Sequence, residues 1–359
     1  MLDGVTVIDF SHYLPGPFAS LRLADLGAEV IKIEPKTGDM MRSLAEECVF
    51  RANNASKKSV ALDLKNEQDL QTAKQLIQKA DVIIESFRPG VMRRLGLSYE
   101  DIRAMNETVI YCSISGFGQQ SKYSLFGSHD LNYMAMTGVL AQLKDQEGRP
   151  IHPTITLADL IGSIHAVEQI VAALYYRERT GKGTYIDLSL VDGLLSMMMN
   201  HFVIEHDTGR KNGIAELAGT VVSYRLYETK DGRYVSLAAL EKKFWENFCH
   251  AVEKPEWILH HDSPASEENP IFHEIVHLFQ TKTLQEWIEF SQTVDCCLAP
   301  VLETDEAKAL FAADSYRKMI HIAGRRIEVA TRYDETLLQK RKPAPSLDEH
   351  GDLLRKKEW

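Results

Sequence analysis

The chain has 359 residues, of which 44% are hydrophobic and 26% are charged, so it is long enough to form two globular domains. Its formal net charge of -10 at pH 7 argues against broad attraction to nucleic acid or to an anionic membrane, and an anionic ligand would need a local basic pocket. The five cysteines include no CxxC pair, so disulfides and a structural zinc site are both disfavoured, and we predict no metal site.

The start of the chain predicts a cytoplasmic protein. No secretory signal is visible, because residues 1–4 lead directly into a strand-like segment. No apolar run reaches the length that spans a bilayer. We therefore expect the protein in the cytoplasm, or in a matrix-like compartment, without membrane or nucleic acid as a partner.

The first part of the chain alternates strands and helices. A helix is predicted over 18–26, ended by Gly27, and another begins after Asn66, which is a suitable N-cap. This alternation favours a parallel sheet covered on both faces. The loop after the first strand has one glycine and lacks GxGxxG, so a nicotinamide dinucleotide site is not predicted, although the sheet can still be Rossmann-like. The predicted strands are 5–10, 29–33, 59–64, 81–85 and 108–113.

The remainder of the chain predicts a second, smaller domain. A helix over 160–177, a strand over 184–190 and a further helix complete the large domain. Beyond Gly209, two strand-like runs flank Lys230-Asp-Gly232, which is a strong hairpin signal, and helical stretches follow. We predict an α/β fold with a Rossmann-like parallel sheet. The predicted parts are a large domain (1–200), a linker (201–217), a small α+β domain (218–303) and a C-terminal segment (304–359).

Three residues are candidates for catalysis. His129 precedes a small-residue helical run and can exchange protons near neutral pH, or it can simply hydrogen-bond a loop. Asp159 lies among apolar residues where a helix begins. Burial would raise its pKa, and it could act as an acid, a base, a nucleophile or a plain N-cap. Glu241 follows the second hairpin strand and could equally be a first-turn helix glutamate.

Basic residues recur near the predicted strand ends, where ligands of open α/β sheets bind. They suit the three phosphates of coenzyme A, although each could be a solvated surface charge. Met134, Met136 and the run 197–199 could line an acyl pocket or pack in the core. The basic residues are Lys57, Lys58, Lys65, Arg88, Arg93 and Arg94.

Motifs along nearly the whole chain resemble the family III coenzyme A transferases (CaiB/BaiF type) and the related α-methylacyl-CoA racemases. Their order and spacing carry the resemblance. They include Asp9-Phe-Ser-His-Tyr-Leu-Pro-Gly-Pro17, Leu26-Gly-Ala-Glu-Val-Ile-Lys-Ile-Glu34, Glu85-Ser-Phe-Arg-Pro-Gly90, Ser115-Gly-Phe-Gly118, Arg179-Thr-Gly-Lys-Gly183 and Pro343-Ala-Pro-Ser-Leu-Asp-Glu-His-Gly351.

The resemblance implies a ring-like chain whose C-terminal segment returns to the large domain, and two such rings interlocked as a homodimer. In the transferases the aspartate matched by Asp159 is a nucleophile, which gives an acyl-aspartyl anhydride and then an aspartyl-CoA thioester. In the racemases the same aspartate donates or accepts a proton, and a histidine and a glutamate are the other functional residues. His129 matches this histidine and Glu241 matches this glutamate. Removal of the α-proton gives a planar enolate, and inversion needs one acid–base group on each face.

Between the two activities, the sequence favours a 2-methylacyl-CoA racemase, with a CoA-transferase as the alternative. The motif Ser128-His-Asp-Leu-Asn-Tyr133 resembles racemases, whereas the placement of Gly162 and His165 resembles transferases. The substrate would be an acyl-CoA thioester, and no cofactor beyond coenzyme A is expected. By resemblance, the coenzyme A contacts are His12, Leu14, Pro15, Lys36, Leu62, Lys65, Ser86, Phe87, Arg88 and Arg94.

Overall fold

A computed structural model describes residues 1–145, 147–313, 320–324, 326–329 and 341–356. The chain forms two compact units, one of residues 1–198 with the described part of 314–359, and one of residues 199–313. The segment 201–217, predicted as a linker, contains most of the helix α9 (Met199–Thr208) and a short 3-10 helix (Ala215–Leu217).

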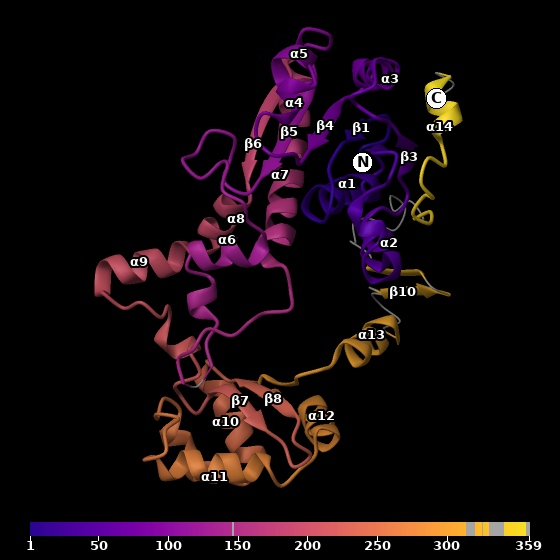
Figure 1. Ribbon diagram of the computed structural model, residues 1–359. Coiled ribbons are helices and arrows are strands. Elements are labelled where there is room, and N and C mark those ends of the chain that lie inside the picture. The colour runs from indigo at the N-terminus through magenta and orange to yellow at the C-terminus, as the bar shows by residue number, and fades with distance from the viewer. Residues whose placement is uncertain (146, 314–319, 325, 330–340, 357–359) are drawn as a thin grey trace. The chain divides into compact units, whose positions relative to one another are not determined.

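The first unit is built on a six-stranded parallel sheet in the order β3-β2-β1-β4-β5-β6 (Figure 1). This is the strand order of the Rossmann fold. The fold class predicted from alternating strands and helices is therefore confirmed for this unit. The strands are β1 (Thr6–Asp9), β2 (Glu29–Glu34), β3 (Lys58–Ala61), β4 (Val82–Glu85), β5 (Ile110–Ser115) and β6 (Thr184–Ser189).

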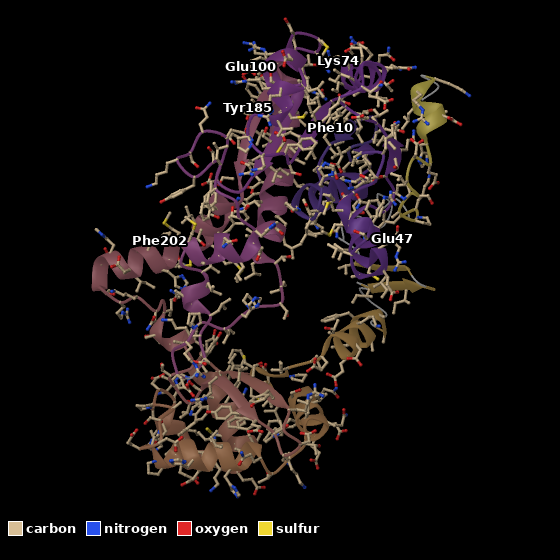
Figure 2. The ribbon with its side chains drawn as sticks, viewed as in Figure 1. Phe10, Glu47, Lys74, Glu100, Tyr185 and Phe202 are labelled. Carbon is tan, nitrogen blue, oxygen red and sulfur yellow. The ribbon has the colours of Figure 1, made fainter. Side chains whose placement is uncertain are left out.

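Helices cover both faces of this sheet. One core cluster joins the sheet to α1, α6, α7 and α8, and a second joins it to α3, α4, α5 and α14, with Phe10 packed inside (Figures 1 and 2). The helices of this unit are α1 (Pro15–Asp25), α2 (Cys48–Asn53), α3 (Glu67–Gln78), α4 (Val91–Arg94), α5 (Tyr99–Arg103), α6 (Asp130–Met136), α7 (Leu157–Thr180), α8 (Leu190–Met197) and α14 (Gly351–Arg355), with 3-10 helices at Met40–Arg42, Ala45–Glu47 and Leu140–Gln142.

The sheet has a topological switch point at β1. The chain passes from β1 through α1 to β2 on one side, and from β3 through α3 to β4 on the other. The loops after β1 and β4 therefore leave the sheet at neighbouring points, and the backbone N–H of His12 donates to the Ser86 hydroxyl oxygen at 3.0 Å. Ligands of open α/β sheets bind in such a crevice.

Helix α7 is longer than the predicted 160–177 and begins three residues earlier. Among the described helices it alone is long and apolar enough to cross a membrane, which differs from the expectation that no run has that length. Ala166 and Ile170 on this helix are fully buried in the core of the first unit. Within its most apolar window 39% of the helix is buried, and a membrane span and a core helix of a soluble protein both pass this test of length and composition.

Residues close to the C-terminus bind to β3, which is one of the two outer strands of the sheet. The Asp348 carboxylate accepts the backbone N–H of Ala61 at 2.8 Å, and the backbone N–H of His350 donates to the carbonyl of Ser59 at 3.0 Å. Leu354 of α14 is buried in the core beside them. A two-stranded antiparallel ribbon precedes this segment, formed by β10 (Ile320–Ala323) and β11 (Arg326–Val329).

The second unit contains a three-stranded antiparallel sheet with helices around an aromatic core. The hairpin predicted around Lys230-Asp-Gly232 is confirmed, since β7 pairs with β8 there. One of the helical stretches predicted after the hairpin, residues 271–290, forms two helices. The elements are α9 (Met199–Thr208), a 3-10 helix (Ala215–Leu217), β7 (Tyr224–Glu228), β8 (Tyr234–Ala238), α10 (Lys242–Ala251), a 3-10 helix (Pro255–His260), α11 (Pro270–Phe279), α12 (Leu284–Thr293), β9 (Leu298–Pro300) and α13 (Thr304–Ala313).

Candidate active site

A cavity of about 430 Å³ lies in the first unit at the carboxyl ends of the strands. The loops after β1, β4 and β5 form its walls, together with the first turns of α6 and α7. His129 and Asp159, predicted from the sequence as a pair, both line it. The lining also includes His12, Tyr13, Pro15, Ser86, Phe87, Arg88, Ser115, Phe117, Phe126, Ser128, Tyr133 and Leu190.

Asp159 lies in the first turn of α7 and is partly buried. Among the described residues, none donates a hydrogen bond to its carboxylate. Burial, and to a smaller extent the neighbouring carboxylate of Asp130, raise the pKa of Asp159 from 3.8 to about 7. Near neutral pH the group therefore exchanges between acid and anion, and as an anion it is poorly solvated. Both properties suit a reactive carboxylate.

His129 is exposed and immediately precedes α6. Its backbone N–H donates to the Asn132 side chain at 3.1 Å, and its ring meets that of Tyr13 edge to face, with centroids 6.5 Å apart. Tyr13 has a left-handed backbone conformation, with φ of 65°. Tyr13 was not named among the predicted contacts, although the resemblance places the surrounding residues 12–15 at coenzyme A.

Asp130 is the second residue that sequence reasoning left without a role. It is buried, and its carboxylate accepts the backbone N–H of Asp159 at 3.0 Å. Burial raises the pKa of Asp130, while bonds from the backbone N–H groups at the start of α7 oppose the rise. The first turn of α7 is thereby capped from α6. The hydroxyl of Ser115, at the end of β5, is buried without a hydrogen-bond partner among the described residues.

A second cavity of about 390 Å³ adjoins the first and holds several of the predicted coenzyme A contacts. The two cavities share His12 and Phe87, whose rings meet edge to face with centroids 5.1 Å apart. Lys36, Leu62 and Lys65 line the second cavity. Lys36 donates to the Ala61 carbonyl at 2.8 Å and forms an ion pair with Asp69 at 3.1 Å, so its ammonium group already has partners.

The other predicted contacts are distributed as follows. Pro15, Ser86 and Arg88 line the 430 Å³ cavity, whereas Leu14 and Arg94 line neither of the two. Arg88 donates to the carbonyl of Leu125 at 2.7 Å, which holds the loop that carries Phe126 and Ser128 against the cavity.

Glu241 belongs to the second unit, where it is exposed and immediately precedes α10. Its part in the site therefore stays a prediction. Met134 and Met198 are buried core residues of the first unit. No methionine is among the described residues that line the 430 Å³ cavity, so core packing explains these two better than an acyl pocket does. The residues that the structure describes include no group of three or more metal-binding side chains.

Lys57, interpreted from the sequence as a phosphate-binding or surface cation, is neither. It is buried, and its ammonium donates to the Asp9 carboxylate at 3.1 Å and to the Pro17 carbonyl at 2.9 Å. Burial lowers the pKa of Lys57 to about 8. Burial alone would raise the pKa of Asp9, yet Lys57 and Lys32 hold it well below its usual range.

This buried ionic network supports the loop that follows β1. Lys32 donates to the carbonyl of Ser11 at 2.7 Å and pairs with Asp39 at 3.0 Å, where both side chains are fully buried. The Ser11 backbone N–H donates to Asp9 at 2.9 Å. The residues next along the chain, His12 and Tyr13, line the cavity. The network therefore holds one wall of the site in place.

Gly162 has a packing reason for its identity. A Cβ at this position would lie 2.2 Å from a terminal methyl carbon of Leu190, so any other residue here would require the Leu190 side chain to move. The similarity of this position to transferases therefore says little about the reaction.

A family model described as CoA-transferase family III matches residues 2–351. The chain belongs to this family. The predicted resemblance is thereby confirmed. The fold is similar to the crystal structure of a CAIB/BAIF family protein from Brucella suis, with a TM-score of 0.87 and 25% sequence identity. The match covers 99% of this family III chain and 98% of the Brucella chain. The fold class is likewise confirmed.

Relatives of this family III chain include enzymes of both kinds. Acetyl-CoA:oxalate CoA-transferase of Acetobacter aceti is 31% identical over 99% of this chain and 95% of its own length. Alpha-methylacyl-CoA racemase of Mus musculus is 32% identical over 86% of this chain and 79% of its own length. The preference for a racemase that the sequence suggested is therefore not supported over a transferase.

Proposed function

We propose that the chain is a CoA-transferase in which the Asp159 carboxylate attacks the carbonyl carbon of an acyl-CoA thioester. The observation that carries this proposal is a partly buried carboxyl that lines an open cavity, has a pKa of about 7 and has no hydrogen-bond donor among the described residues. A carboxylate of raised pKa is a better nucleophile than an ordinary one, because its electron pair is less stabilised. The match of the oxalate transferase along nearly the whole chain also supports the proposal.

The proposed reaction balances with the protein's own groups and two substrates. Asp159 attacks the thioester, the coenzyme A thiolate leaves, and an acyl-aspartyl anhydride forms. The thiolate then attacks the aspartyl carbonyl, which releases the first acid and leaves an aspartyl-CoA thioester. The carboxylate of the second acid reverses these two steps and departs as its CoA thioester. No metal or redox cofactor is required. Acids named in the transferase relatives, among them oxalate and glutarate, are the first acceptors to test.

A second candidate is an acyl-CoA racemase. It is favoured by one specific observation, the presence of His129 and Asp159 on the walls of the same cavity. Asp159 would take the α-proton on one face of the enolate and His129 would return it on the other. The racemase relatives support this alternative.

One pair of assays decides between the candidates. For a transferase we expect exchange of label between free acids and acyl-CoA, and a hydroxylamine-sensitive coenzyme A adduct on Asp159 by mass spectrometry. For a racemase we expect α-deuterium incorporation from deuterated water into 2-methylacyl-CoA. His129→Ala should be mild in the first case and should abolish inversion in the second. Absence of exchange, adduct and deuterium across a panel of acids and acyl chains would contradict both candidates.

We also propose that the protein acts as an interlocked homodimer in the cytoplasm, without nucleic acid or membrane as a partner. The outer face of α7 supports a dimer, because apolar side chains at helical spacing are exposed there. They are Ile164 (48% exposed), Val171 (37%) and Tyr175 (64%). A second copy is the occupant that this face suits.

Light scattering at micromolar concentration should therefore give the mass of two chains. Val171→Asp should shift the mass toward one chain, because it places a charge in the apolar face. The control is Thr180→Asp, which adds the same charge at the exposed end of the same helix. A monomeric wild-type protein would be incompatible with this proposal.

A further inference from the structure

We propose that Asp130 is a positioning residue that holds Asp159 at the wall of the cavity and keeps its carboxyl group available for proton exchange. The inference rests on the proposed function, since it concerns the same reactive carboxylate. Asp130 itself lies behind the cavity wall and is not among the residues that line it. It acts through Asp159.

The geometry ties the two candidate groups together through one carboxylate. Asp130 immediately follows His129 and lies in the first turn of α6. It accepts the backbone N–H of Asp159, in the first turn of α7, across a sequence separation of 29 residues. A displacement of either helix would change the distance between His129 and Asp159, so this bond acts as a brace between them.

Capping of α7 depends on this distant residue. The residue at the N-cap position, Thr156, makes no side-chain capping bond. A helix begins with backbone N–H groups that have no partner within the helix, and an N-cap side chain normally accepts a hydrogen bond from one of them. Asp130 supplies this capping bond from another helix, α6. A capping residue at position 156 would satisfy the same backbone N–H but would not connect α7 to α6. The arrangement therefore adds a link between helices to the ordinary stability of a cap.

Of the two neighbouring carboxyl groups, Asp130 is the one whose ionised form the surroundings favour more. Asp130 receives backbone N–H bonds at the positive end of α7, which favour its anion. The Asp159 carboxylate receives none from the described residues, and the charge on Asp130 disfavours a second charge beside it. Asp159 is thus the group that holds the proton near neutral pH. The other titratable or charged side chains around the cavity are His12, Tyr13, Arg88, His129 and Tyr133.

The first test is independent of any activity. Above pH 3.8 the ionisation of Asp159 costs the folded state stability, and this cost grows until pH passes about 7. The difference in Tm between Asp159→Asn and the wild type should therefore rise over that window and then level off. The same comparison is then made with Asp130→Asn in both proteins. The difference in Tm caused by Asp159→Asn should now level off at a lower pH, because the pKa of Asp159 falls when the charge on Asp130 is removed. An unchanged window in that background overturns the proposal.

The second test uses whichever turnover assay is positive. Asp130→Ala should lower kcat by roughly 10- to 100-fold with little change in KM, because the reactive group is misplaced while the 390 Å³ cavity with the predicted coenzyme A contacts is untouched. Asp130→Asn keeps an acceptor for the backbone N–H, so it should recover much of kcat and move the acid limb of the pH–rate profile to lower pH. If Asp130→Ala and Asp130→Asn lower kcat equally and the pH–rate profile does not shift, Asp130 is only a structural cap of α7. That result overturns the proposal.

A matched control is Asp187→Asn. The Asp187 carboxylate also accepts a backbone N–H, that of Gln119, at 3.0 Å, and it is exposed. The Asp187→Asn variant should change neither the pH range over which the Tm difference rises nor the acid limb of the pH–rate profile. If the protein shows neither transferase nor racemase activity, the proposed function fails, while the stability comparison still decides the role of Asp130.

Discussion

Asp159→Asn should abolish turnover of acyl-CoA in either of the proposed reactions. In a transferase the amide cannot form the anhydride, so activity should fall to background. In a racemase one of the two acid–base groups is lost, and such groups are worth roughly 10²–10⁴-fold. Steady-state assays at pH 7 with the purified variant measure the loss. Retention of near-normal rates would show that the site has been misassigned.

The same variant should be more stable than the wild type above pH 7. The folded pKa of Asp159 is raised from 3.8 to about 7, so its folded state binds a proton that the unfolded state has released. The wild type therefore loses stability as pH rises through this window, by at most about 4 kcal/mol for a shift of about three units. Asparagine is neutral at every pH and avoids this loss. Urea unfolding at pH 5 and pH 8 should show the advantage mainly at pH 8.

Lys57→Met should destabilise the protein by about 3–5 kcal/mol, because it leaves the buried Asp9 without its nearest countercharge. The loop after β1 should loosen as well, since Asp9 anchors its first residues. Urea unfolding at neutral pH measures the effect.

Its neighbour provides a matched control. Lys58 forms an ion pair with Glu29 in which both side chains are partly exposed, and surface pairs of this kind are worth up to about 1 kcal/mol. Lys58→Met should therefore have a small effect. Adding Asp9→Asn to Lys57→Met should recover part of the lost stability, since no buried charge is then left alone. Equal stability of the two lysine variants would argue against the network as described.

The parallel sheet and the hairpin could be predicted because their signals are local. Short apolar runs such as Val82–Glu85 and the Asp231-Gly232 turn specify their own conformation. The family could be recognised because its motifs are spread over residues 2–351. The family resemblance also predicted that His129 and Asp159 act together, and the structure places both residues on the wall of one cavity.

The roles of Lys57 and Asp130 could not be predicted, because each depends on a partner that is remote in sequence. Lys57 meets Asp9 from 48 residues away, and Asp130 meets Asp159 from 29 residues away. A lysine next to another lysine indicates surface charge by composition, and only the packing of α1 against the sheet turns Lys57 inward. Lys36 lines the 390 Å³ cavity as a predicted contact, and its ion pair with Asp69 likewise became visible only in the structure.

The pairing of the C-terminal segment with β3 has a consequence for how the protein is made. β3 is one of the two outer strands of the sheet, and an uncovered outer strand is a template for association with other chains. The bond between Ala61 and Asp348 spans 287 residues, so nearly the whole chain must leave the ribosome before this edge is covered. At typical rates of about 5–20 residues per second, the sheet edge stays open for roughly 15–60 seconds of synthesis. During that interval the nascent first unit is most exposed to aggregation, and chaperones have their longest opportunity to bind it.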